Sequence, residues 1–159
     1  LTFVHPYDDE AIVAGQGTVG LEMLQARPDL DVLVIAVGGG GLIAGNAVAI
    51  RALAPQVKVI GVEVESYPSF HNALTGESLP IGGPTLAEGI AVKYVGRQTL
   101  PIVRELVAGH VIVPESAVER AVDAFATHSR TMAEGAGAAG LAAAARRNIP
   151  RAPRRPLSG

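Results

Sequence analysis

The chain has 159 residues, of which 48% are hydrophobic and 4% aromatic, so one domain with a core of small aliphatic side chains is expected. It contains no cysteine, which excludes disulfides and thiolate metal sites. The formal net charge of −2 hides an arginine-rich end at residues 146–155, but no aromatic residues are interleaved there, so a nucleic-acid surface is not indicated.

The first predicted element is a helix. Asp8 or Asp9 can cap its N-terminus, and the helical pattern runs to about Ala26. Four apolar side chains are expected near one face of this helix: Ile12, Val19, Met23 and Leu24. Three glycines inside it suggest close packing against a neighbouring backbone: Gly15, Gly17 and Gly20.

A strand–helix–strand unit is predicted next. The segments "DVLVIAV" (31–37) and "VKVIGVEVE" (57–65) are apolar and β-branched, as expected for parallel strands buried on both faces. A helix from about 42 to 53 lies between them. The length of this unit is typical of a right-handed crossover between neighbouring parallel strands.

The second half of the chain predicts three more helices and one strand. The helices are expected at 97–108, 116–129 and 134–147, and the strand at 110–114. Alternating strands and helices indicate an α/β fold, here a three-layer sandwich around a mostly parallel sheet. We expect residues 1–149 to form this domain and residues 150–159 to be an Arg/Pro-rich terminal segment.

Four consecutive glycines, Gly38 to Gly41, separate the first strand from the helix that follows it. A glycine-rich turn into a helix N-terminus exposes backbone amides and favours a bound anion. From the residues alone, two kinds of anionic ligand are possible, a dinucleotide or a single phosphate group. Gly39, Gly41 and Ala44 match the spacing of a dinucleotide fingerprint, with Glu63 as the ribose-binding acid. A single phosphate group would need only the amides of residues 38–42.

Five segments in unbroken order resemble the C-terminal part of the threonine/serine dehydratases: "HPYDDEAIVAGQGTVGLEML", "VGGGGLIAG", "VIGVE", "GPTLAEGIAVK" and "MAEGAGAAGLAA". These are fold type II enzymes that use pyridoxal 5'-phosphate, and serine racemases are among their relatives. The resemblance covers about Leu1 to Ala145. It implies β-elimination of a hydroxyl from an amino acid, giving a 2-oxo acid and ammonia, in amino-acid metabolism such as isoleucine biosynthesis. It also implies a homo-oligomer, a dimer or tetramer.

The resemblance assigns cofactor-binding roles to eight positions. The tetraglycine loop would wrap the cofactor phosphate, one further glycine and one carboxylate would lie near the ring, and a terminal serine would face the pyridine nitrogen. In that order the residues are Gly38, Gly39, Gly40, Gly41, Leu42, Gly89, Glu134 and Ser158.

The same resemblance implies a structural cation. Its ligands would be the Glu63 carboxylate, the backbone carbonyl near Tyr67 and the side chain of Ser69. Racemase relatives carry an acid at the last position. Serine removes a charge that Mg²⁺ or Ca²⁺ favours, so a weaker or monovalent site is left open.

The chain lacks a candidate for the Schiff-base lysine of the family. Lys58 and Lys93 are its only lysines, and neither matches that position, which the resemblance puts upstream. We therefore expect a portion of a longer enzyme that has no catalytic residue of its own and is inactive alone. The four histidines are expected in structural or surface roles: His5, His71, His110 and His128.

Three classes of function stay open at this point. The first is a dehydratase portion, with a serine racemase-like enzyme as its near variant. The second is an NAD-binding dehydrogenase domain, and the third is a non-catalytic remnant of the fold. We expect a cytoplasmic protein that acts on a small amino acid, without a signal segment, a membrane span or a nucleic-acid partner.

Overall fold

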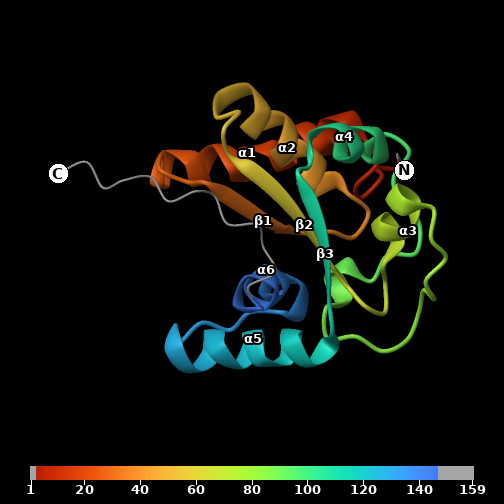
Figure 1. Ribbon diagram of the computed structural model, residues 1–159. Coiled ribbons are helices and arrows are strands. Elements are labelled where there is room, and N and C mark those ends of the chain that lie inside the picture. Colours follow the sequence, from red (N-terminus) through yellow and green to blue (C-terminus); the bar gives the residue numbers. More distant parts are fainter. Residues whose placement is uncertain (1–2, 147–159) are drawn as a thin grey trace.

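The computed structural model describes residues 3–146, which form a three-layer α/β sandwich (Figure 1). The sheet has three strands in the order β1 (Val32–Ala36), β2 (Lys58–Val64) and β3 (Gly109–Val113). The helices are α1 (Glu10–Ala26), α2 (Gly41–Leu53), α3 (Ser69–Thr75), the 3-10 turn η1 (Glu88–Ile90), α4 (Thr99–Leu106), α5 (Glu115–His128) and α6 (Gly135–Ala145). The predicted α/β class is confirmed.

All pairs of neighbouring strands are parallel. Val32 pairs with Lys58 at the start of β1, and Ile60 pairs with Gly109 at the start of β3. β2 is therefore central, and every residue of it except Lys58 is buried. The outer edge of β1 pairs with no strand in the part of the chain that the structure describes.

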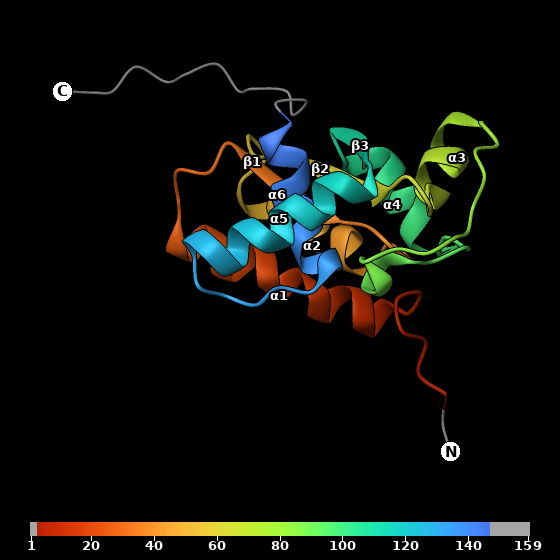
Figure 2. The ribbon, with the colours of Figure 1, turned by 90° about the horizontal axis from the view of Figure 1, so that it is seen from below.

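Helices cover both faces of the sheet and divide the core in two. On one face, Leu33, Ile35 and Phe70 belong to a cluster that the helices α1, α2 and α4 complete. On the other face, Val62 and Val118 belong to the cluster formed with α5 and α6. Figure 2, viewed from below, shows α5 and α6 lying across this second face. The alternation of strand side chains between the faces supplies both clusters.

Two backbones come into close contact where α1 crosses α2. A Cβ at Gly17 would lie 2.9 Å from the Gly45 carbonyl oxygen, and a Cβ at Gly45 would collide with the Val13 carbonyl. The buried side chain of Asn46 ties the pair together, because its amide donates to the carbonyls of Gln16 (3.1 Å) and Leu42 (2.7 Å). The predicted close packing against a neighbouring backbone is confirmed at Gly17, whereas an added Cβ at Gly20 would meet the Asn46 side chain.

Two details of the predicted α1 are wrong. Gly15 has no atom within 4 Å of an added Cβ, so it faces solvent. The face that packs on α2 contains Val13, Gly17 and Gly20, whereas Val19 and Met23 are 39% and 43% exposed. The crossing uses glycines because they permit the shortest distance between the helices, which turns the larger apolar side chains away. Among residues 3–146, no helix is both long and apolar enough to cross a membrane.

Candidate functional site

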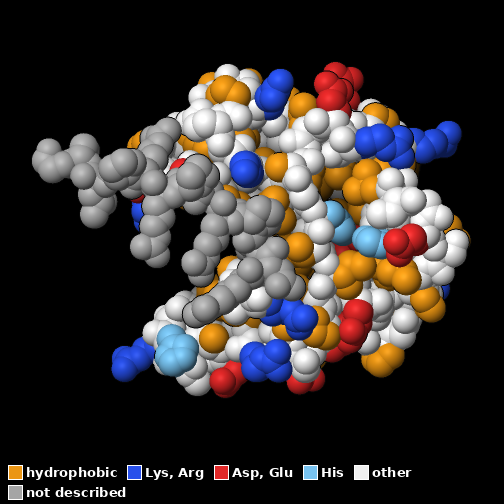
Figure 3. Space-filling model, in the orientation of Figure 1, with side chains coloured by type: hydrophobic (Ala, Val, Ile, Leu, Met, Phe, Trp, Pro, Cys, Tyr) orange, Lys and Arg blue, Asp and Glu red, His pale blue; other side chains and the backbone are white. Residues whose placement is uncertain are grey.

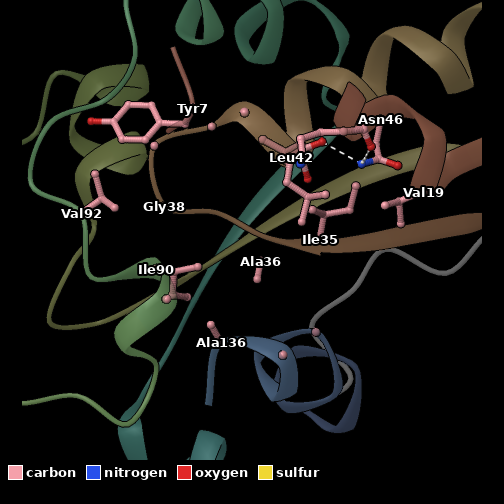
Figure 4. Close-up of a pocket in the computed structure, with 18 of the residues that line it drawn as sticks. Tyr7, Val19, Ile35, Ala36, Gly38, Leu42, Asn46, Ile90, Val92 and Ala136 are labelled. Atoms are coloured by element: carbon pink, nitrogen blue, oxygen red, sulfur yellow. Dashed lines mark hydrogen bonds between the residues drawn. The ribbon is translucent and has the colours of Figure 1, made fainter. Parts of the chain in front are cut away.

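A cavity of about 630 Å³ opens beside the free edge of β1, where that strand leads into α2 (Figure 4). The glycine loop and Leu42 form one wall, and Ile90 and Val92 form another. Tyr7 covers the loop end, and Ala136 of α6 lies across from it. The small side chains around the middle leave room for a flat ligand.

In the glycine loop, the Gly39 and Gly40 carbonyls have hydrogen-bond partners, whereas the backbone amides of residues 38–42 have none among the described residues. The Gly39 carbonyl accepts hydrogen bonds from the Thr99 hydroxyl (2.8 Å) and the Gly96 amide (3.2 Å), and the Gly40 carbonyl accepts one from Ala44 (2.9 Å). Within residues 3–146, the backbone amides of 38–42 donate no hydrogen bond to another group. Unpaired amides at a helix N-terminus form a site for an anion.

The glycines themselves are required by contacts within the chain. An added Cβ would meet the Tyr7 ring at Gly39, the Tyr7 backbone at Gly41, and the Phe70 ring at Gly40. At Gly38 it would lie 3.1 Å from the Cα of Ile90. The sequence alone linked these glycines to a bound anion. In the structure, protein atoms already occupy each of those positions, and the ligand would use the amides instead.

Tyr7 and Asp8 anchor the segment that covers the loop. The Tyr7 hydroxyl donates to the Tyr94 carbonyl (3.0 Å), and the Asp8 carboxylate accepts from the amides of Arg97 (2.9 Å) and Gln98 (2.8 Å). Burial raises the pKa of Asp8, but hydrogen bonds from these amides outweigh it and hold the pKa below its ordinary value of 3.8. Sequence reasoning missed both roles, although the two residues lie in the quoted "HPYDD" segment.

The two residues expected near a cofactor ring lie together. Glu134 immediately precedes α6, and its Oε1 is 3.5 Å from the Gly89 amide nitrogen. Gly89 lines the cavity, and an added Cβ there would be 3.1 Å from the Cβ of Ala136. The structure thus brings Gly89, which lines the cavity, together with Glu134, which does not line it, while their roles stay predictions. Ser158 and residues 150–159 lie outside the described residues.

The residues expected to hold a cation are on the far side of the glycine loop. The Glu63 side chain is 1% exposed, and its carboxylate accepts from the amides of Phe70 (2.6 Å) and His71 (2.9 Å) and contacts His110 Nε2 (2.7 Å). The Ser69 hydroxyl donates to the Val92 carbonyl (2.5 Å). Glu63 does not line the cavity, which disfavours its role as a ribose-binding acid. Tyr67 packs against the second core cluster.

Neither lysine lines the cavity, although Lys93 directly follows Val92, which does. Lys58 is exposed at the start of β2, at the opposite end of the sheet from the glycine loop, and Lys93 is exposed in the loop before α4. His5 has a structural contact, because its Nδ1 accepts a hydrogen bond from the Asp8 amide (2.9 Å). His128 is exposed at the end of α5.

The fold and the unpaired amides at the cavity are those of an α/β protein with a site suited to a small anionic group. The chain belongs to the family described as pyridoxal-phosphate dependent enzymes, whose model matches residues 1–154. Pyridoxal phosphate is therefore the cofactor of its family.

Relatives within the family are similar over most of this chain. An L-threonine ammonia-lyase of Geobacter sulfurreducens is 47% identical over 149 residues, which cover 92% of this chain and 37% of the relative. The structure of processed threonine deaminase isoform 2 from Solanum lycopersicum has a TM-score of 0.84 and 35% identity, with 91% of this chain and 40% of that chain covered. The maize serine racemase structure has a TM-score of 0.83 and 31% identity, with 89% of this chain and 45% of that chain covered. The chain thus spans less than half of the length of these proteins.

Proposed function

We propose that this chain is the phosphate-binding portion of a pyridoxal-phosphate dependent threonine/serine dehydratase. The observation that carries the proposal is the row of backbone amides at residues 38–42, which line the cavity and have no partner within residues 3–146. Among the solved structures, the identity to two threonine deaminases, 36% and 35%, exceeds the 31% to the maize serine racemase, and this favours the dehydratase over the racemase.

The cofactor fits this cavity by the chemistry of its donors. Amides at a helix N-terminus can hold a phosphate dianion without a lysine that would compete for the cofactor aldehyde. Gly89 and Ala136 carry no side chain larger than a methyl group, which leaves space for the ring. Glu134 would place a carboxylate beside Gly89. When bound, pyridoxal phosphate supplies an electron-withdrawing ring that assists loss of an α-proton and a β-hydroxyl.

The complete activity needs residues beyond this chain. Neither Lys58 nor Lys93 lines the cavity, so we infer that a Schiff-base lysine would come from another part of the enzyme. The free edge of β1 and the exposed apolar side chains of Val19 and Met23 support the same inference, since further elements could pack there. We infer that this chain anchors and positions the cofactor, and that a homo-oligomer forms from the full enzyme.

The proposal is tested by comparing pyridoxal phosphate with pyridoxal. Equilibrium dialysis of the purified protein should show binding of pyridoxal phosphate that inorganic phosphate displaces, and much weaker binding of pyridoxal. The Lys58→Ala and Lys93→Ala variants should bind like the parent, and no stable absorption band of a covalent lysine adduct should develop. A strong band that either substitution abolishes would contradict the assignment, as would equal retention of pyridoxal.

A further inference from the structure

We propose that His110 holds the buried carboxylate of Glu63 in the place that the family resemblance gives to a metal ion. The resemblance implies a cation bound by Glu63, the carbonyl near Tyr67 and Ser69. The contacts of these residues in this chain point to a site completed by protein donors, with an imidazole as the last of them.

The Glu63 carboxylate already has three N–H donors. Two are the amides of Phe70 and His71, and the third is Nε2 of His110, 2.7 Å from Oε2. With Nε2 as the donor, Oε2 accepts from both the His71 amide and the imidazole, and Oε1 accepts from the Phe70 amide. A buried carboxylate is costly unless it is paired and hydrogen-bonded, and these three donors meet that need. The His110 side chain is 11% exposed and keeps this contact largely shielded from solvent.

The remaining donors do not suit a divalent cation. Mg²⁺ and Ca²⁺ take six or more oxygen ligands, and carboxylates are the charged protein groups among them. Glu63 is the only acid among the three expected ligands, and the Ser69 hydroxyl is used by the Val92 carbonyl. A second acid, Glu77, contacts His71 Nε2 at 3.1 Å. Among residues 3–146, no cluster of three or more His, Asp and Glu residues could hold a metal ion.

The fold makes specific room for the imidazole. Gly61 of β2 is the register partner of His110 on β3, and a Cβ there would lie 2.9 Å from His110 Nδ1. The His71 ring lies 6.3 Å from the His110 ring, and histidine atoms are visible side by side on this face of the molecule (Figure 3). A glycine at 61 and a histidine at 110 therefore form a matched pair across the two strands.

The pair also supports the cofactor loop. Glu63 caps the start of α3 through the amides of Phe70 and His71, and this fixes the position of the Phe70 ring. Phe70 is fully buried and packs against Gly40 of the glycine loop. His110 is thus a positioning residue that acts on the loop through Glu63 and Phe70.

The test measures thermal stability of the protein without cofactor, so its failure is distinguishable from failure of the proposed function. Melting temperatures are compared in sodium buffer with a chelator and with added Mg²⁺, Ca²⁺ or K⁺ at matched ionic strength. The parent protein should melt at the same temperature in all of them. His110→Ile removes one donor from a buried carboxylate, and its melting temperature should fall by about 5 °C or more. It should also recover partly when Mg²⁺ or K⁺ is added.

Two further variants keep the test decisive. His110→Gln retains a side-chain N–H donor near the Nε2 position, so it should stay close to the parent and insensitive to cations. His128→Ile, at an exposed histidine, is the control and should behave as the parent does. If His110→Ile fails to fold, the parent and His110→Gln ion series still decide. Stabilisation of the parent by Mg²⁺ or K⁺, or parent-like stability of His110→Ile, would overturn the proposal.

Discussion

Two glycine-rich regions of this molecule use glycine in different ways. At the α1–α2 crossing, Gly17 and Gly45 bring two helix backbones together, and helix amides there are engaged within their own helices. At the loop between β1 and α2, Gly39 and Gly40 also admit protein atoms closely, but the amides of 38–42 have no partner in the described residues. Both regions therefore contain several glycines. Whether the backbone amides have hydrogen-bond partners distinguishes the packing contact from the candidate binding site.

The difference teaches where a functional signal is found. Both regions would be damaged by added side chains, so intolerance of substitution does not identify a ligand. Unpaired amides facing a cavity do, because a polar group left without a partner in the folded state has a free-energy cost that a ligand can remove.

The largest effect is expected at the helix crossing. Gly45→Ala would drive a Cβ into the Val13 carbonyl and to within 2.7 Å of the Gly17 nitrogen. Backbone cannot move aside easily, so we expect a loss of about 3 kcal/mol or more in the free energy of unfolding, measured by denaturant titration. The matched control is Gly137→Ala in α6, where an added Cβ meets no atom within 4 Å. Equal free energies of unfolding for Gly45→Ala and Gly137→Ala would contradict the claim that the helix crossing requires glycine at position 45.

A smaller loss of stability, with a loss of binding, is expected in the loop. Gly40 has φ of +95°, and an added Cβ would meet the Phe70 ring and the Thr99 hydroxyl. Gly40→Ala should lower the free energy of unfolding by about 2 kcal/mol. It should also weaken pyridoxal phosphate binding at least tenfold, since the loop amides would be displaced. Gly45→Ala protein that remains folded should bind pyridoxal phosphate like the parent. Loss of binding in both Gly40→Ala and Gly45→Ala would contradict the distinction between the packing contact and the binding loop.

A pH effect is expected where the covering segment meets α4. The pKa of Asp8 is lowered in the folded state, so its contribution to stability is present above the ordinary value of 3.8 and is lost as the pH falls through the lower folded value. The free energy of unfolding, measured against pH in that acidic range, should therefore decline less steeply in Asp8→Asn than in the parent. Identical slopes would show that the hydrogen bonds to Arg97 and Gln98 do not hold the carboxylate.

The smallest effect has the opposite sign. Gly15 is helical and its missing Cβ faces open space, so Gly15→Ala restricts the unfolded chain without a collision. The free energy of unfolding should rise by about 0.5–1 kcal/mol. A destabilised variant would mean that α1 packs on its Gly15 side against something outside the described residues.

Most of the fold could be predicted because its signals are local. The β-branched runs of β1 and β2 and the Asp9 cap of α1 identify their elements within two residues of the observed ends. The short elements α3 and η1 were not delimited. α3 has seven residues, and Glu63 caps it from the preceding strand, so its stability comes from a tertiary contact.

The site was only partly predictable for the same reason. The tetraglycine loop stands out in the sequence, and the structure places it in the lining of the cavity. Tyr7, Phe70 and Thr99 fill the space above the glycines from distant parts of the chain, and local patterns do not encode such contacts. The outward turn of Val19 and Met23 was missed because hydrophobicity alone does not tell a core face from one beside a cavity.

The central claim is tested most directly by an amide NMR titration of ¹⁵N-labelled protein with pyridoxal phosphate, with pyridoxal as the control. If the loop amides clasp the phosphate, the largest shifts should fall on Gly38 to Leu42, and pyridoxal should leave these signals nearly unchanged. Shifts confined to other parts of the chain, or equal shifts with both compounds, would contradict the account.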